Sequence, residues 1–536
     1  MAGSSREPTL DQSSPVSWFD DKGLSPLLLF QIVTVRIKTN VVLSSPMDST
    51  SKSHSSNVGV AIIGAGFCGT MVAVHLLRSS LPQPTIALID RNNSFGRGVA
   101  YRTTDPLHLL NVPAGKMGAF PDDPEHFWKW LQAQPKTSDR QGLKGIDPGS
   151  FIPRMVYGDY LETLLRDAER ATGRLTRFKE EALDVIPLSD GAFQIMLASD
   201  HRIEAEKIVL ALGNFPPGDP LLRERRFHTS HFYLHTPWAP ATRELLSKPG
   251  DVLILGSGLT ALDLLLSLMR TKEEGMIHIL SQRGLFPHPH KACPAYPSFL
   301  QANRLPTTAR SLLREVRCEV AHAMEQGIDW RAVVDSLRPF NQALWQGFNL
   351  VERRRFMRHV RSYWEPHRHR AAPETLAVKE TLESQGKLQC HRGRLTQIAE
   401  NTEGLHVAFQ PLRAKSPEEL DVHYVINCTG PECNYHKLKD PLIAQLFARG
   451  LIYSDPLLLG VDVGTNGIIH NACGECVRNL HTLGSPQKGR LFETTAVPEL
   501  RVQAKQLAQQ ILQELTCETG QLSQLHRHDL VYVYKI

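Results

Sequence analysis

The sequence predicts an α/β protein built from two Rossmann-like domains and a helical insert. Two short glycine-rich turns support this fold class, at residues 64–69 and 256–261, and each lies between an apolar strand and an apolar helix. The third observation is residues 295–385, which are poor in glycine and rich in Arg, Glu and Leu, as expected of helices.

Length and composition indicate the class of protein. A chain of 536 residues is too long for one ordinary core and predicts two or three domains. The hydrophobic content of 41% and charged content of 21% are typical of a soluble globular protein, which we expect to be cytoplasmic. The net charge of +5 gives no support for a nucleic-acid partner. Nine scattered cysteines, an odd number, indicate reduced thiols and not a disulfide framework.

The first 57 residues are expected to form a disordered leader, because they are rich in Ser and Thr. Met47 offers a second start just before the first strand, so the leader is expected to be dispensable. The apolar run at residues 27–35 is too short to span a bilayer, and no small-residue cleavage site follows it. We therefore expect no integral membrane segment, with a peripheral anchor as the alternative.

The first glycine-rich turn contains Gly64, Gly66 and Gly69 in the spacing G-x-G-x-x-G. The first glycine permits a tight turn, the second lets the backbone approach a pyrophosphate, and the third allows close packing of helix on strand. The next strand ends at Asp90, about 21 residues after the turn, where a carboxylate binds ribose hydroxyls. This register of strand, turn, helix, strand and acid predicts a dinucleotide site.

The second turn contains Gly256 and Gly258, with Ala261 at the third position, which the fingerprint allows. The following strand ends at Ser281 and Arg283 instead of an acid. A serine hydroxyl and an arginine fork can bind a 2′-phosphate, so this site is expected to prefer NADPH over NADH. The alternative is that Arg283 is only a solvated loop charge.

Two such turns in one chain indicate that FAD occupies the first site and NADPH the second, with hydride passing from nicotinamide to flavin. Composition and segment order then predict discontinuous domains. The expected segments are a leader (1–57), the first part of the FAD-binding domain (58–250), the first part of the NADPH-binding domain (251–294), the helical insert (295–385), the return of the NADPH-binding domain (386–430), the second part of the FAD-binding domain (431–516) and a tail (517–536).

Beyond the two turns, the chain resembles one family of flavoproteins over residues 58–516. The stretches that carry the resemblance are "GRGVAY" (96–101), "HLLNVPAGKMGAFPDDPEHFWKWL" (108–131), "SQRGLFPHPH" (281–290), "YWEPHRHR" (363–370) and "LHTLGSPQKGRLFETTAVPELR" (480–501). They are similar to the FAD/NAD(P)-binding family that contains flavin-dependent urate hydroxylases and aspartate N-monooxygenases, distant relatives of ornithine N-hydroxylases.

The resemblance implies further cofactor contacts. Segments around Gly213 and Gly430 resemble the crossovers that join the two cofactor domains, and the loop at Gly98 would pass beside the flavin ring. The loop at Gly484 and the helix after it would face the flavin, whose reduced form a helix N-terminus stabilises. Many flavoproteins have Asp in this loop, whereas Ser485 stands here, which leaves the ribityl contact in doubt.

Catalytic residues cannot be assigned from the sequence, and five candidates remain. Asn111 and Lys116 lie in the loop expected beside the flavin, with ordinary loop hydrogen bonding as the alternative. His367, Arg368 and Arg370 end an arginine-rich stretch of the insert. They are expected to point into the cleft between the domains and bind an anionic group, whereas the alternative is a solvated helix face.

These observations predict an NADPH-dependent FAD monooxygenase that acts through a C4a-hydroperoxyflavin on a small, polar, nitrogen-bearing metabolite, with O2 as co-substrate. The alternative is a reductase that passes electrons to a quinone, disulfide or partner protein. Cys473 and Cys476 form a C-x-x-C pair that could serve such a reductase, although the flanking segments predict a hairpin tip away from the flavin. No second such pair completes a zinc site, so no metal is expected. A flavin-binding protein without catalytic activity is a third alternative. The oligomeric state cannot be predicted.

Overall fold

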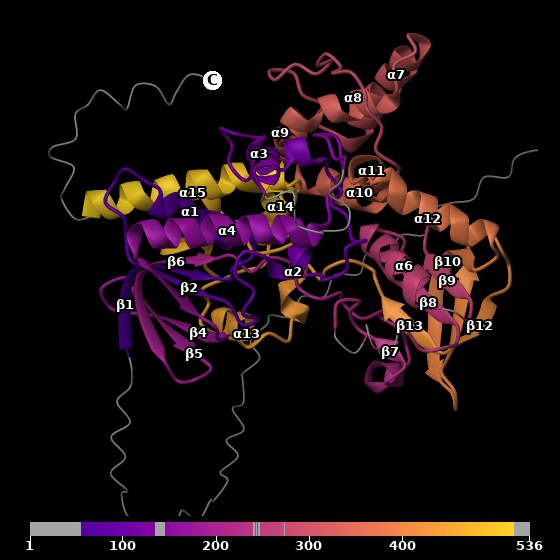
Figure 1. Ribbon diagram of the computed structural model, residues 1–536, viewed down its shortest axis with the longest axis horizontal. Coiled ribbons are helices and arrows are strands. Elements are labelled where there is room, and N and C mark those ends of the chain that lie inside the picture. Colours follow the sequence, from indigo (N-terminus) through magenta and orange to yellow (C-terminus); the bar gives the residue numbers. More distant parts are fainter. Residues whose placement is uncertain are drawn as a thin grey trace, which may run out of the picture. The chain divides into compact units, whose positions relative to one another are not determined.

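The computed structural model describes residues 55–518, apart from 135–144, 240–241, 243, 245–246 and 273 (Figure 1). Most of the predicted leader and tail lies outside these residues. The first strand begins at Ser55, three residues before the predicted boundary at 58, and the last helix continues to Glu518, into the predicted tail. The described residues all belong to one compact unit of the chain.

The first sheet has the strand order β14-β15-β6-β1-β2-β3, and the hairpin of β4 and β5 joins it at β6. The pairs from β15 to β3 are parallel, so the carboxyl ends of β1, β2 and β6 lie at the same edge. The strands are β1 (Ser55–Ile63), β2 (Ile86–Ile89), β3 (Leu175–Phe178), β4 (Ala182–Pro187), β5 (Phe193–Leu197), β6 (Arg202–Leu210), β14 (Ile468–His470) and β15 (Cys476–Thr482).

Helices α1 (Phe67–Leu77), α4 (Arg154–Thr172) and α15 (Val497–Glu518) run side by side along one face of this sheet (Figure 1). Helix α1 is apolar on all sides, as its run of Met, Val and Leu predicts, and it is therefore buried between the sheet and the other two helices. The opposite face packs against α13 (Pro441–Ala448) and the β4–β5 hairpin. The shorter helices of this domain are α2 (Gly98–Tyr101), α3 (His126–Ala133) and α14 (Lys488–Leu491).

The second sheet has the strand order β12-β11-β10-β9-β8-β13-β7, parallel from β10 to β7 and antiparallel beyond β10. Helices α6 (Leu259–Thr271) and α12 (Pro373–Ser384) cover one of its faces. The strands are β7 (Tyr233–Leu234), β8 (Val252–Leu255), β9 (Ile277–Ser281), β10 (Leu388–Glu400), β11 (Leu405–Pro411), β12 (Glu418–Val422) and β13 (Tyr424–Asn427). The two sheets, each packed against helices, confirm the predicted α/β fold class.

Two predicted domain boundaries differ from the packing. Strand β7 lies before residue 250 yet pairs with β13 in the second sheet. Helix α12 lies within the predicted insert, but its leucines pack in the core of the second domain, where a helix must connect the parallel strands β9 and β10. The helices that remain in the insert are α7 (Ala309–Glu325), α8 (Trp330–Ser336), α9 (Asn341–Gly347), α10 (Leu350–His359) and α11 (Arg361–Arg368).

A buried charge cluster ties α15 to the first sheet. Lys207 on β6 is fully buried, and its ammonium lies 3.0 Å from the Glu514 carboxylate and 2.8 Å from the Asn479 side-chain oxygen. His481 on β15 is also buried and lies 3.6 Å from the same carboxylate. Burial acts to raise the pKa of Glu514, but contacts with His481, Gln510 and Lys207 outweigh it and lower the pKa to about 2.

We expect Glu514→Gln to lower the free energy of unfolding by about 3 kcal/mol at neutral pH, because it removes the negative charge that Glu514 places 3.0 Å from the buried ammonium of Lys207. The pKa of Glu514 is lower in the folded than in the unfolded chain, so its contribution is present above pH 4.5 and is lost as the pH falls toward about 2. Urea unfolding at a series of pH values measures both effects. A variant as stable as the parent chain over this range would contradict the assignment.

Candidate functional site

The first glycine turn joins β1 to α1 in the predicted geometry. Gly64 has φ of +103°, and a Cβ at this position would overlap the carbonyl oxygen of Ala211. A Cβ at Gly69 would overlap the carbonyl oxygen of Gly64. Gly66 is the N-cap of α1, and no side chain of the described residues caps this helix end. Its free N–H groups and positive dipole end therefore fit a phosphate.

Asp90 lies directly after β2 and beside this turn. One carboxylate oxygen accepts a hydrogen bond from the Ala65 N–H at 3.2 Å, and the other accepts one from the Asn92 N–H at 2.9 Å. The carboxylate thus orders the turn, and its predicted contact with ribose stays a prediction. Gly98 lies over Gly66, because a Cβ at Gly98 would be 2.8 Å from the Gly66 Cα.

Two further segments meet beside the first turn. Gly213 has φ of +65° with open space around it, and the next residue, Asn214, lines a cleft. The Ser485 hydroxyl donates a hydrogen bond to the Asn214 side-chain oxygen at 2.7 Å. At Gly484, φ is +76° and a Cβ would lie 3.0 Å from the sulfur of Cys68 in α1. The structure therefore brings these predicted cofactor segments together.

The second glycine turn has the same backbone plan. Gly256 has φ of +104° and lies against the carbonyl of Cys428. Gly258 is the N-cap of α6, without a side-chain cap among the described residues, and a Cβ here would meet no atom within 4 Å. Ala261, in the first turn of α6, is fully buried. Gly430, with φ of +93°, lines the cleft that Asn214 also lines. This helix end is open to a phosphate.

Ser281 and Arg283 lie at the end of β9 and line the cleft. The Ser281 hydroxyl accepts a hydrogen bond from the Gly284 N–H at 3.0 Å, which fixes the turn. The Arg283 guanidinium lies 5.1 Å from the ring centre of Tyr363, and one of its nitrogens lies 3.2 Å from the Tyr363 hydroxyl. Tyr363 thus positions Arg283, a role that no sequence pattern indicated, since Arg and Tyr are 80 residues apart.

The cleft has a volume of about 1080 Å³, larger than a typical pocket for one small molecule. It extends from the second glycine turn to the loop at Tyr101 and Asn111 and to the start of α15. Several basic residues of its wall were not predicted, among them Arg358 and Arg361 of the insert, Arg394 of β10, and Lys488 of α14. Its lining also includes Arg154, Asp263, Glu365, His369, Thr429, Ser485, Thr495, Ala496 and Val497.

The start of α15 faces the cleft, as the sequence predicted. Thr495, Ala496 and Val497 line the cleft, and α15 begins at Val497, so the positive end of this helix dipole lies at the wall. Lys488 lies at the same wall and adds a positive charge. A cofactor ring that gains negative charge on reduction fits beside these groups.

Arg368 and Arg370 do not line the cleft, contrary to the expectation for the insert. Arg368 lies 3.4 Å from a carboxylate oxygen of Glu493 and 3.5 Å from one of Glu499. Arg370 is buried and pairs with Asp335. Two carboxylates already neutralise the Arg368 guanidinium, and one neutralises that of Arg370, so a ligand would have to compete with them. His367 also lies outside the cleft wall, with its ring against Trp330 and its Nδ1 2.7 Å from the Tyr363 carbonyl oxygen.

Glu493 fastens the insert to the loop that precedes α15. The Trp364 indole donates a hydrogen bond to its carboxylate at 2.8 Å, and the Gln342 amide donates one to its backbone carbonyl at 3.0 Å. Burial acts to raise the pKa of Glu493, but Arg368 and the Trp364 hydrogen bond lower it below the ordinary value. The preceding Phe492 has φ of +56°, a strained value for an aromatic residue.

Trp345 holds this strained bend from the side of the insert. Its ring stacks on Phe492 at 4.6 Å, and its indole donates a hydrogen bond to the Gly489 carbonyl at 2.9 Å. Because the bend lies between Lys488 and Thr495, which both line the cleft, the insert fixes the cleft wall from behind. Sequence reasoning missed these contacts, since Trp345 and Gly489 are 144 residues apart.

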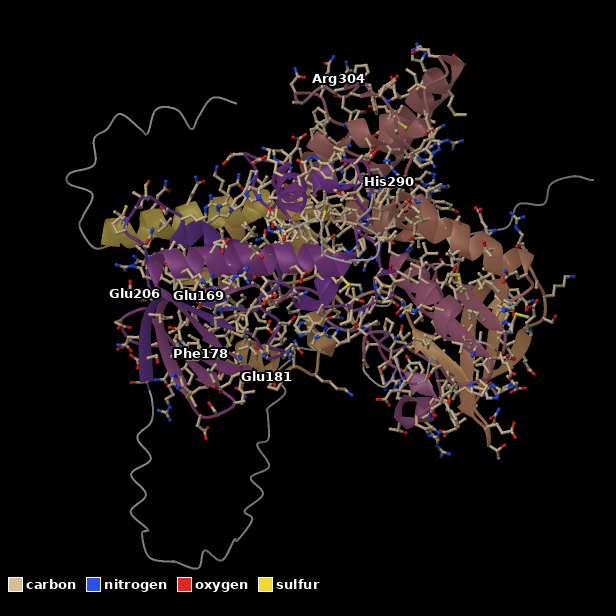
Figure 2. All side chains as sticks on the ribbon, viewed as in Figure 1. Glu169, Phe178, Glu181, Glu206, His290 and Arg304 are labelled. Atoms are coloured by element: carbon tan, nitrogen blue, oxygen red, sulfur yellow. The ribbon has the colours of Figure 1, made fainter. Side chains whose placement is uncertain are left out.

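Asn111 lines the cleft, whereas Lys116 is exposed and lies outside its wall. His290, marked in Figure 2, donates a hydrogen bond from Nε2 to the Asn111 backbone carbonyl at 2.8 Å. Burial lowers the pKa of His290 to about 4, against the opposing effect of this hydrogen bond. The ring is therefore neutral at physiological pH, and it joins the segment that follows β9 to the loop of Asn111.

The two domains also meet through buried polar groups. Arg154 at the start of α4 lies 2.8 Å from the carboxylate of Asp263 on α6. Burial raises the pKa of Asp263, and Arg154 opposes this rise. His108 lies 2.9 Å from the Ser267 hydroxyl, which in turn donates a hydrogen bond to Asp105. These contacts hold α6, and with it the second glycine turn, against the first domain.

Cys473 and Cys476 lie at the tip of the β14–β15 hairpin, as predicted, and both are exposed. Neither lines the cleft. We expect Cys473→Ser and Cys476→Ser to leave the rate of NADPH oxidation unchanged, because both thiols are exposed at the hairpin tip and neither lines the cleft. Steady-state NADPH oxidation by the two single variants and the double variant checks this. A large loss of rate would favour the reductase alternative.

Within the described parts of the chain, no cluster of three or more His, Cys, Asp or Glu side chains could bind a metal ion. In the same residues, no helix combines the length and the apolar character needed to cross a bilayer.

Comparison with known proteins places the fold. Residues 61–215 match the model of the family described as FAD-NAD(P)-binding, so this part of the chain is a FAD/NAD(P)-binding domain. Both glycine turns, with their uncapped helix ends, fit such cofactors. The sequence has no significant match among curated proteins.

Solved structures that resemble this chain include amino-acid hydroxylases and monooxygenases. L-Lysine 6-monooxygenase from Pseudomonas syringae has a TM-score of 0.60 and 16% identity, covering 85% of this chain and 99% of its own. Ornithine hydroxylase from Pseudomonas aeruginosa has a TM-score of 0.59 and 15% identity, with the same coverages of 85% and 99%. Ornithine N-hydroxylase from Kutzneria sp. 744, solved with reduced FAD, NADP+ and L-ornithine, has a TM-score of 0.55 and 14% identity, covering 86% and 100%. At these identities the likeness establishes the fold.

Proposed function

We propose that this chain is an NADPH-dependent FAD monooxygenase that oxygenates a small, polar, nitrogen-bearing metabolite. The observation that carries the proposal is the single cleft that joins the second glycine turn to the loops beside the first. The nicotinamide of a dinucleotide whose pyrophosphate is held at Gly258 and a flavin ring held near Ser485 would meet in this space. The fold shared with lysine and ornithine hydroxylases supports the same reaction class.

Different residues of the chain would bind different parts of the two cofactors. The N–H groups at the starts of α1 and α6 hold the two pyrophosphates, and Ser281 and Arg283 bind the 2′-phosphate of NADPH. Bound FAD would supply hydride acceptance and the activation of O2. Lys488 and the start of α15 stabilise negative charge at the flavin ring. The apolar side chains of Leu110, Val112 and Met117 line the cleft and exclude water that would waste the oxidant.

The substrate is proposed to enter beside the insert. Arg358, Arg361 and Arg394 line that wall, where Arg361 already forms an ion pair with Glu365 at 2.7 Å. Arg358 and Arg394 would bind a carboxylate or another anionic group of the metabolite. Glu365 and Asn111 offer oxygen atoms that would accept hydrogen bonds from an amine. The nitrogen to be oxygenated would then lie toward the flavin side of the cleft.

Product analysis with isotopically labelled dioxygen tests the reaction class. The protein loaded with FAD is supplied with NADPH and with amines, guanidines and nitrogen heterocycles in turn. We expect one class to accelerate O2 uptake and to yield a product that carries one labelled oxygen atom. If NADPH oxidation is never accelerated and all O2 is returned as hydrogen peroxide, while quinones or disulfides are reduced, the chain is a reductase instead.

A further inference from the structure

A second cavity lies inside the insert, between α7, α9 and the α10–α11 pair. Its volume is about 70 Å³, far below the roughly 300 Å³ of the smallest usual pockets for organic ligands. Its wall is formed by leucine, valine, phenylalanine and tryptophan side chains, with Asn341 and Glu493 as the polar exceptions. The cavity therefore suits a molecule of a few atoms at most.

The cavity and the cleft share one wall. Phe356, Val360 and Trp364 of the α10–α11 pair face the cavity, whereas Met357, Arg361 and Glu365 of the same pair face the cleft. A layer one helix thick thus separates the two spaces.

The lining residues differ in exposure. Leu313 of α7 is 42% exposed, so the wall that it forms is thin toward the protein surface. Phe492 and Glu493 also line the cavity, in the bend between the cleft residues Lys488 and Thr495. The cavity therefore adjoins the part of the cleft wall beside which the flavin is proposed to lie.

The polar groups of the cavity do not suit water. A buried water needs two to four polar partners, and the Glu493 carboxylate is already bound by Trp364 and Arg368. The Asn341 amide, whose nitrogen has no hydrogen-bond partner among the described residues, is the only other polar side chain besides Glu493 in the described lining of the cavity. An apolar space of this kind stays dry and takes up small apolar molecules, as hydrophobic transfer favours.

We propose that this cavity binds dioxygen and supplies it to the cleft. O2 is small, apolar and diatomic, and it is the co-substrate of the proposed function, on which this inference rests. The insert then has two tasks: it fixes the cleft wall through Glu493, and it concentrates the gas behind that wall.

Dissolved O2 is paramagnetic, so NMR of methyl groups in the oxidised, FAD-loaded protein tests binding without turnover. We expect O2 to broaden the methyl signals of Leu344 and of the partly exposed Val316, which line the cavity, severalfold more than those of Leu382, which is as buried as Leu344 but lies elsewhere. Ala309→Leu should remove the difference, because the added side chain fills the cavity, whereas Ala321→Leu on the exposed face of α7 should not. Equal broadening at all three residues would overturn the proposal.

The second measurement tests supply to the cleft. The FAD-loaded protein is reduced by NADPH without oxygen and mixed with O2 at several concentrations. We expect the second-order rate constant of reoxidation to fall severalfold in Ala309→Leu and to stay unchanged in Ala321→Leu, with the same rate of reduction by NADPH in all. Leu312→Phe is a second filling variant in case Ala309→Leu folds poorly.

The outcomes separate this inference from the proposed function. An O2 rate constant unchanged by both filling variants would overturn the supply role even if a labelled product forms. Conversely, reoxidation without any oxygenated product would defeat the proposed monooxygenase, while the methyl broadening would still decide whether the cavity binds O2.

Discussion

Replacing Gly64 by alanine is expected to abolish FAD binding together with most of the stability of the first domain. Gly64 has φ of +103°, which disfavours any residue with a Cβ, and its added methyl group would overlap the carbonyl oxygen of Ala211. That oxygen belongs to backbone that cannot rotate away. Yellow colour after purification and thermal unfolding measure the two effects.

Gly66→Ala is the matched control for this glycine. At Gly66, φ is −74°, and a Cβ would meet only the Gly98 Cα, at 3.5 Å, which is an ordinary contact. The variant should fold nearly as well as the parent chain but bind FAD more weakly, because the methyl group lies where the backbone approaches the pyrophosphate. Gly64→Ala that folds and retains FAD like the parent chain would contradict the described turn.

Replacing Arg283 by alanine is expected to lower kcat/KM for NADPH by roughly ten- to hundredfold, because a hydrogen bond to a charged group contributes about 1.5–3 kcal/mol. The value for NADH should change little, since NADH carries no 2′-phosphate. Steady-state kinetics with both nucleotides measure the ratio. Tyr363→Phe should cause a smaller loss, because the ring that supports Arg283 remains while the hydroxyl contact is removed.

Arg170→Ala serves as the control, because it removes the same side chain from an exposed position on α4. Its kinetics with both nucleotides should match those of the parent chain. An equal loss for NADPH and NADH in Arg283→Ala would show that Arg283 holds a part common to both nucleotides and not the 2′-phosphate.

The local elements of the fold could be predicted from the sequence. Each glycine turn lies between an apolar strand and an apolar helix, and the physical constraints of such a turn are local: positive φ at Gly64 and Gly256, and close helix packing at Gly69. For the same reason the C-x-x-C hairpin and the long last helix were predictable. Local hydrogen bonds and hydrophobic periodicity decide these elements.

The partners of the charged residues could not be predicted in this way. The arginine-rich stretch of the insert is compatible with ligand binding, with a solvated face and with internal ion pairs. The outcome for Arg368 depends on where Glu493 and Glu499 arrive, more than 100 residues later in the chain. Likewise Tyr363 is exposed because the chain bends at Val360, between α10 and α11, and its ring supports Arg283.

The basic residues that line the cleft could not be predicted for the same reason. Arg358, Arg361 and Arg394 come from the insert and from β10, and their convergence on one cleft is a property of the tertiary packing. The boundaries of the insert also followed packing: α12 is continuous with the insert in sequence, but its leucines are needed to cover the second sheet.

Anaerobic reduction of the FAD-loaded protein tests the central claim, that two dinucleotide sites share one cleft. The protein is mixed with NADPH or NADH without oxygen, and the visible absorbance of the oxidised flavin is followed in time. The account predicts that NADPH bleaches the flavin in a single turnover, faster than NADH at equal concentration. A flavin spectrum that stays unchanged with both nucleotides would contradict hydride transfer between the two sites.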